Sequence, residues 1–143
     1  MAVLEQVQDD VKTAMKARDR ERAGALRMIV DVLQKDAKLG DGDEVAVLQR
    51  ERKKRVEAAE AYEKAGRAEQ AAAERFEAEL IEGYLPQQLS DEELAQIVAA
   101  AVEETGATEQ RQMGQVMSAA MPKVGGRADG KRVSAAVREK LGA

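Results

Sequence analysis

The chain has 143 residues with neither cysteine nor histidine, which excludes disulfides, thiolate metal sites and the commonest catalytic base. Aromatic residues make up 2% of it and charged residues 35%, a composition that favours amphipathic helices with aliphatic cores over β-sheets. No apolar run approaches the roughly 20 residues that span a bilayer, and the N-terminus lacks the pattern of a signal peptide. We therefore expect an all-α, cytoplasmic protein with no membrane contact.

Four helices are predicted in the first part of the chain. Apolar residues at helical spacing predict a first helix that ends at about Arg18, and Asp19 is placed to cap the second. The segment GDGD at 40–43 breaks the chain, after which Asp43 can cap a long, polar third helix. Gly66 either ends or bends that helix, and a fourth helix follows.

The segment YLPQQLSDEEL, at 84–94, contains the clearest boundary. Pro86 disfavours helix at the residue before it. We therefore expect an N-terminal helical domain over residues 1–86 and a C-terminal domain over residues 87–143.

Three helices are predicted in the C-terminal domain. Ser90 followed by Glu93 is a capping box that opens the first. Thr108 is placed to cap the second, which we expect Pro122 to stop. Asp129 is placed to cap the last.

Charge is distributed unevenly along a chain whose net charge is −4. Residues 90–110 hold six acidic residues and no basic one, whereas residues 111–143 hold seven basic residues and two acidic ones. Such asymmetry can direct one face of an acidic protein at a polyanion.

The segment GGRADGKR at 125–132 resembles a phosphate-binding loop of nucleotide hydrolases, but Arg132 stands where that loop needs a hydroxyl and no strand precedes it. Two interpretations remain. The segment is either a plain helix connection shaped by glycines, or a phosphate-facing turn with Arg127, Lys131 and Arg132 at a helix N-terminus.

Other patterns leave alternatives open or carry no chemistry. One side of the third helix carries Arg50, Lys53 and Lys54. This side is either a solvated face or a face that contacts phosphate groups. Residues 41–52 lack the glycine and glutamate of a calcium loop. The sixth predicted helix has a methionine at every fourth position: Met113, Met117 and Met121. These side chains either fill the core or form a flexible groove for a partner protein. We predict no catalytic residue, no cofactor site and no metal site.

Four segments, in order and with their spacing, resemble the YqeY family of small proteins related to the tail of the GatB subunit of the tRNA-dependent amidotransferase. They are TAMKARDRERAGALRMI (13–29), EAAEAYEKAGR (57–67), IEGYLPQQLSDEEL (81–94) and MGQVMSAAMPKVGGRADGKRV (113–133). The chain differs from the usual family pattern at Gln112, often acidic, and at Ser118, often glycine.

The resemblance implies a four-helix N-terminal part followed by a three-helix domain like the GatB tail, which helps to engage tRNA. The matching positions here are the basic residues Lys123, Arg127 and Lys131, with the glycines Gly125, Gly126 and Gly130 shaping the loop. The GatB region that carries the chemistry of this glutamine-dependent carbon–nitrogen ligase has no counterpart in the chain.

The leading hypothesis is a non-catalytic module that binds tRNA and has an aminoacyl-tRNA synthetase or an amidotransferase complex as its expected protein partner. Its nucleic-acid contacts are expected from the loop residues above together with Arg132. The alternative is a protein-interaction adaptor that docks through residues 90–110 or the methionine face. An amidotransferase ranks last, because no nucleophile, base or nucleotide site can be named.

Overall fold

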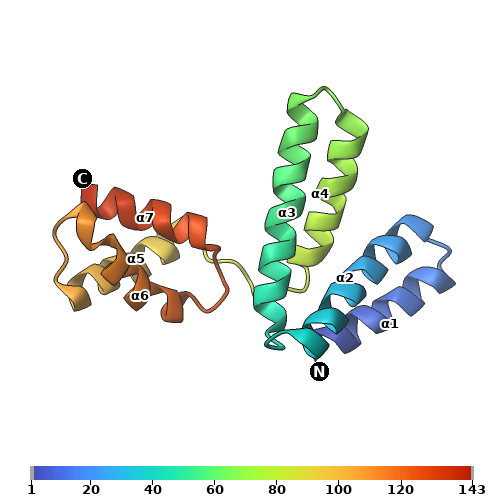
Figure 1. The fold of residues 1–143 in the computed structure, drawn as a ribbon, viewed down its shortest axis with the longest axis horizontal. Helices are drawn as coiled ribbons and strands as arrows, with labels where there is room; N and C mark the ends of the chain where they lie inside the picture. Colours follow the sequence, from blue (N-terminus) through green and yellow to red (C-terminus); the bar gives the residue numbers. More distant parts are fainter. Residues whose placement is uncertain (1, 143) are drawn as a thin grey trace. The chain divides into compact units, whose positions relative to one another are not determined.

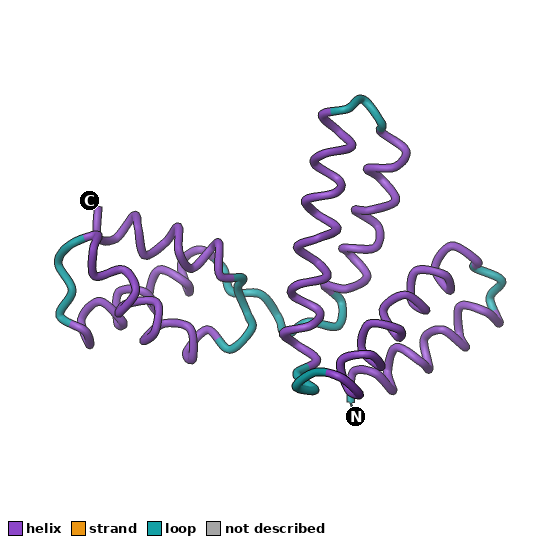
Figure 2. Tube along the Cα trace, viewed as in Figure 1, coloured by secondary structure: helices purple, strands orange, loops and turns teal. Residues whose placement is uncertain are grey.

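A computed structural model describes residues 2–142, and these form seven α-helices and one short 3₁₀ helix, without any strand (Figures 1 and 2). The predicted all-α class is confirmed. The chain divides into two compact units, Met1–Leu85 and Pro86–Ala143. Within the described residues, every helix is too short or too polar to cross a membrane.

The Met1–Leu85 unit consists of two helical hairpins (Figure 1). The first hairpin pairs α1 (Val3–Lys16) with α2 (Arg20–Leu39), and the second pairs α3 (Glu44–Lys64) with α4 (Ala68–Glu82). The hairpins share one core, to which α3 contributes its first turns and α4 its last; it includes Val7, Leu26, Leu33, Leu48 and Ile81. The turn between α1 and α2 and the turn between α3 and α4 lie at the ends of the hairpins that are farther from this core (Figure 1).

Side-chain caps set where these helices begin. Asp19 and Asp43 each accept a hydrogen bond of 3.1 Å from the backbone amide three residues later, as the sequence predicted. A third cap comes from another helix: the Glu44 carboxylate accepts from the amides of Val3, at 3.1 Å, and Leu4, at 2.8 Å. The first residue of α3 therefore satisfies the otherwise unpaired start of α1.

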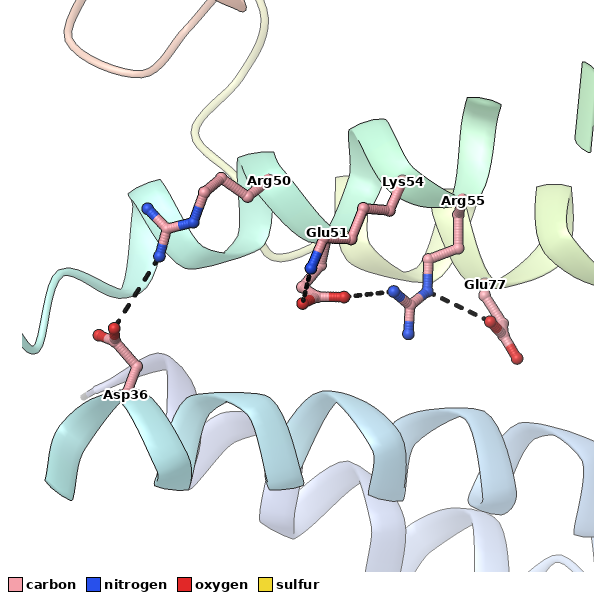
Figure 3. Close-up of polar contacts among 6 residues, drawn as sticks. All are labelled: Asp36, Arg50, Glu51, Lys54, Arg55 and Glu77. Carbon is pink, nitrogen blue, oxygen red and sulfur yellow. Dashed lines mark hydrogen bonds and ion pairs between the residues drawn. The ribbon is translucent and has the colours of Figure 1, made fainter. Parts of the chain in front are cut away.

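The outer part of the α3–α4 hairpin is held by small side chains and ion pairs rather than by a large core. Its buried residues are all alanines, which let the helices approach closely: Ala59, Ala71 and Ala78. Arg55 lies between Glu51 of its own helix and Glu77 of α4 (Figure 3). Its side chain is only 12% exposed, so this ion pair is well shielded from water.

Gly66 ends α3 rather than bending it. It adopts a left-handed backbone with φ of +72°, and α4 starts two residues later. Because the helix ends here, Glu63 and Arg67 form no ion pair with each other. Instead, Glu63 accepts a 2.7 Å hydrogen bond from Arg75 across the hairpin, and this contact lowers the pKa of Glu63.

Tyr84 connects the end of α4 to the first hairpin, because its hydroxyl donates a hydrogen bond to the Asp10 carboxylate. Burial of the phenol, followed by this hydrogen bond, raises the pKa of Tyr84.

We expect Tyr84 to make the stability of this unit fall at alkaline pH. Its folded-state pKa lies above the unfolded value of about 10, so its contribution is full below that pH and is lost as the pH rises further. In Tyr84→Phe, the part of the fall in unfolding free energy that comes from ionisation of the Tyr84 hydroxyl is absent. Urea unfolding of both proteins at pH 8 to 11 measures it, and an identical alkaline slope in the variant would contradict the assignment.

The Pro86–Ala143 unit contains α5 (Asp91–Thr105), the 3₁₀ helix η1 (Gln110–Gln112), α6 (Met113–Val124) and α7 (Gly130–Gly142). Its core is a separate aliphatic cluster that all three α-helices build: Leu94, Val98, Val116, Val124, Val133 and Val137. The capping box predicted at the start of α5 is present, with reciprocal Ser90–Glu93 hydrogen bonds of 3.1 Å. Hydrogen bonding from Ser90 to the Glu93 carboxylate, foremost from the Ser90 amide, lowers the pKa of Glu93.

The sequence misplaced both ends of the second helix in this unit. Thr108 does not cap it; instead, the Gln112 side chain accepts from the amides of Thr108 and Glu109, and a 3₁₀ turn precedes α6. Pro122 does not stop it either, because α6 continues to Val124. A proline so near the end removes one backbone hydrogen bond of the last turn, and a left-handed glycine ends the helix three residues later.

The methionines of α6 border the core instead of filling it. Met113 and Met117 are half-buried, and Met121 is 39% exposed. The fully buried positions of this helix are smaller: Val116, Ala120 and Val124.

Candidate nucleic-acid interface

The predicted loop residues Lys123 and Arg127 are engaged within their own unit. The Lys123 ammonium lies 2.7 Å from a carboxylate oxygen of Glu104 on α5. The Arg127 guanidinium donates to the carbonyl oxygens of Val124, at 3.0 Å, and Lys123, at 2.8 Å. Arg127 therefore caps the C-terminal carbonyls of α6, a position where a cation also complements the helix dipole.

Arg132 ties α7 to the start of α5. Its guanidinium donates to the Leu89 carbonyl at 2.9 Å and to the Asp91 carboxylate at 3.0 Å. The Leu89 amide in turn donates to the Arg127 carbonyl at 2.7 Å. Arg127 and Arg132 thus brace the loop against the segment that precedes α5.

The three glycines of the loop are not equivalent. Gly125 and Gly126 have φ of +57° and +82°, which side chains rarely adopt. Gly130 has no such backbone, and a Cβ atom built on it meets nothing within 4 Å. Asp129 accepts a 2.8 Å hydrogen bond from the Arg132 amide and so caps α7 as predicted. The loop shape therefore depends on the first two glycines and on Asp129.

Lys131 is the predicted basic residue that remains available. It is exposed and forms no hydrogen bond or ion pair with another described residue. Arg138 follows seven residues later, so it lies two turns further along the same side of α7. Arg138 is exposed and forms no ion pair within residues 2–142, where its guanidinium donates only to the Ser134 hydroxyl, at 3.5 Å. We name Lys131 and Arg138 the α7 basic face.

Arg138 was not among the predicted site residues, because it lies outside the glycine loop that carries the phosphate-loop pattern. The spacing of the residues does indicate it. Lys131 and Arg138 are seven residues apart on a helix whose buried positions are Val133 and Val137. A helix that buries those positions exposes Lys131 and Arg138 together.

The basic run on α3 is partly neutralised by neighbouring carboxylates (Figure 3). Arg50 lies 3.9 Å from Asp36 of α2, and Lys54 lies 3.5 Å from Glu51. Lys53 is exposed and has no such partner in the described part of the chain. These contacts favour the solvated-face interpretation of the run.

Comparison with known proteins adds one result to this geometry. The family described as Yqey-like protein matches residues 4–141. The chain belongs to the YqeY family. The match spans both units, so the family pattern includes the α1–α2 hairpin as well as the glycine loop. No curated protein matches the chain.

Side chains that could hold a metal ion are dispersed in the described part of this YqeY-family chain. No group of three or more metal-binding side chains lies close together there. No polar or charged residue in that part of the chain is fully buried. Tyr84 is the group in that part of the chain whose pKa is strongly raised, by partial burial and by its hydrogen bond to the Asp10 carboxylate.

Proposed function

We propose that this YqeY-family protein is a non-enzymatic helical module that binds tRNA, as an accessory to tRNA-dependent amidation or aminoacylation. The observation that carries the proposal is the α7 basic face, where Lys131 and Arg138 lie exposed and free of carboxylate partners. The proposed partner class comes from the resemblance of the Pro86–Ala143 unit to the GatB tail.

Phosphate recognition is the binding mode that this face supports. Its two cations are spaced roughly 10 Å apart along the helix, so each can contact a different phosphate group. Aromatic residues make up only 2% of the chain, which argues against base stacking. Recognition of a folded RNA by its backbone and shape fits these residues better than readout of base sequence.

The remaining loop residues take different roles in this proposal. The Lys123–Glu104 pair is solvent-exposed, with 43% and 59% of the two side chains accessible, so Lys123 can exchange its carboxylate for a phosphate at little cost. Arg127 and Arg132 support the loop through their internal hydrogen bonds. Substituting them tests the structure of the loop rather than ligand contact.

We expect the double variant Lys131→Ala/Arg138→Ala to bind bulk cellular tRNA more weakly. Each lost phosphate contact weakens binding roughly eightfold at 0.1 M salt. The slope of log affinity against log salt falls by about two for the pair. Titration at 50 and 200 mM salt measures both quantities.

The matched control is Arg111→Ala/Lys140→Ala, which removes the same charge from the same unit outside the α7 basic face. We expect its affinity and slope to stay close to those of the unsubstituted chain. Equal losses in both variants would contradict the site. Salt-independent binding of a protein partner, without tRNA binding, would instead favour the adaptor.

A further inference from the structure

A second concentration of positive charge lies in the other unit, at the turn between α1 and α2. Arg18, Arg20 and Arg27 line a hollow of about 550 Å³ there, together with Met15, Asp19 and Ala23. Arg27 also lines an adjoining hollow with Lys12 and Asp31. We name the four exposed cations, Lys12, Arg18, Arg20 and Arg27, the α1–α2 basic face.

These four cations are not neutralised within the described part of the chain. None of them forms an ion pair with a carboxylate there. Arg27 contacts only the Met15 sulfur, at 3.2 Å. The Asp19 carboxylate beside them is occupied as a helix cap.

Other arginines of the same unit behave differently. Arg52, Arg55 and Arg75 each pair with a glutamate of a neighbouring helix. These three arginines of the α3–α4 hairpin are thus internal ion-pair partners, whereas the three arginines of the α1–α2 basic face are not.

The backbone of Arg18 provides an independent argument. Its φ is +60°, and it is the one non-glycine residue with positive φ in residues 2–142. The equivalent left-handed positions after α3, α5 and α6 are glycines: Gly66, Gly106 and Gly125. The amides of Arg18 and Asp19 close the α1 terminus onto the carbonyls of Met15, at 3.1 Å, and Ala14, at 2.9 Å.

A glycine would fit this turn with less strain, because the left-handed region is unfavourable for a residue with a Cβ atom. Within residues 2–142, the Arg18 side chain forms no hydrogen bond or ion pair that compensates for that strain. Backbone strain of this kind concentrates at functional positions. The guanidinium of Arg18 is thus the feature that this position offers to a ligand.

We propose that the α1–α2 basic face binds the phosphodiester backbone of a folded RNA. Guanidinium groups match phosphate oxygens with paired, charge-assisted hydrogen bonds, and three of the four cations are arginines. The face contains no aromatic residue to insert into a membrane or stack on bases. The inference takes its ligand class from the proposed function but stands on different residues in a different unit.

The first test compares two triple variants of the full chain with bulk cellular tRNA as the probe. Arg18→Gly/Arg20→Ala/Arg27→Ala removes three charges from the α1–α2 basic face. The control, Lys53→Ala/Lys64→Ala/Arg67→Ala, removes three charges from exposed residues of the same unit that form no ion pair. We expect the first variant to lose affinity about a hundredfold or more at 0.1 M salt and the salt slope to fall by about three. Equal losses in the control, or no loss in the first variant, would overturn the inference.

Arg18→Gly alone separates binding from folding. Relief of the strained backbone is expected to raise the Tm by about 4 °C, while tRNA affinity falls roughly eightfold at 0.1 M salt. A variant that is more stable yet binds less cannot be explained by misfolding. Unchanged affinity in this variant would overturn the role assigned to Arg18.

Two further arms keep this inference distinct from the α7 site and from other anionic partners. If Lys131→Ala/Arg138→Ala binds tRNA normally and the arginine triple variant does not, the α7 site is contradicted and this inference stands. If the arginine triple variant binds tRNA normally and Lys131→Ala/Arg138→Ala does not, this inference alone is overturned. Vesicles of phosphatidylserine are the second arm. The proposal would be overturned if the chain bound these vesicles with the same affinity as tRNA and the arginine triple variant lost that binding. The α1–α2 basic face would then be assigned to membrane lipids.

Discussion

Leu94→Ala is expected to unfold the Pro86–Ala143 unit while the Met1–Leu85 unit stays folded. Leu94 is 3% exposed in the second core, and no residue belongs to both cores. Replacing a buried leucine by alanine costs about 2 to 5 kcal/mol. A unit of this size has a total stability of only about 3 to 9 kcal/mol, so a loss of about 5 kcal/mol removes at least half of it.

The tyrosines make this prediction directly measurable. Tyr62 and Tyr84 both lie in the Met1–Leu85 unit, and the other unit contains no aromatic residue. In Leu94→Ala, far-ultraviolet circular dichroism should show lost helix at low urea, while the midpoint followed by tyrosine fluorescence stays in place. The control is Leu26→Ala in the first core, where Leu26 is fully buried and the fluorescence midpoint should fall. Coincident shifts of both signals in both variants would show that the units unfold as one.

The helices were predictable because their signals are local. Asp19, Asp43 and the Ser90–Glu93 box each determine a helix start through hydrogen bonds that span three residues. The errors arose where two local signals compete. Pro122 is a stop signal, but the glycine at 125 provides a better one, and the buried face of α6 extends to Val124.

The availability of each cation was not predictable, because ion pairing depends on contacts between helices. Lys123, Arg132 and Lys131 look alike in the glycine loop, yet the first two pair with Glu104 and Asp91 of α5 and only Lys131 stays free. No sequence rule assigns a partner 19 or 41 residues away. The positive φ of Arg18 was not predictable for a different reason, because a glycine is the residue that normally marks such a turn.

Arg55→Met is expected to destabilise the Met1–Leu85 unit by about 3 kcal/mol. The Arg55 side chain is 12% exposed, and its partners Glu51 and Glu77 are 15% and 24% exposed (Figure 3). Removing the guanidinium leaves Glu77 without its cation and Glu51 with only the longer contact to Lys54, at 3.5 Å. A shielded charge without a partner costs more than the pair contributes.

Two companion variants test that explanation by urea unfolding followed through tyrosine fluorescence. Arg75→Met makes the same substitution in the exposed Arg75–Glu63 pair of the same hairpin, whose side chains are 45% and 49% exposed, and should change little. Arg55→Met/Glu51→Gln/Glu77→Gln removes both stranded charges and should recover most of the loss. If the triple variant is no more stable than Arg55→Met, the cost comes from lost packing of the long arginine side chain between α3 and α4 rather than from stranded charge. Recovery would show that the alanine-lined hairpin depends on shielded charge where it lacks a large apolar core.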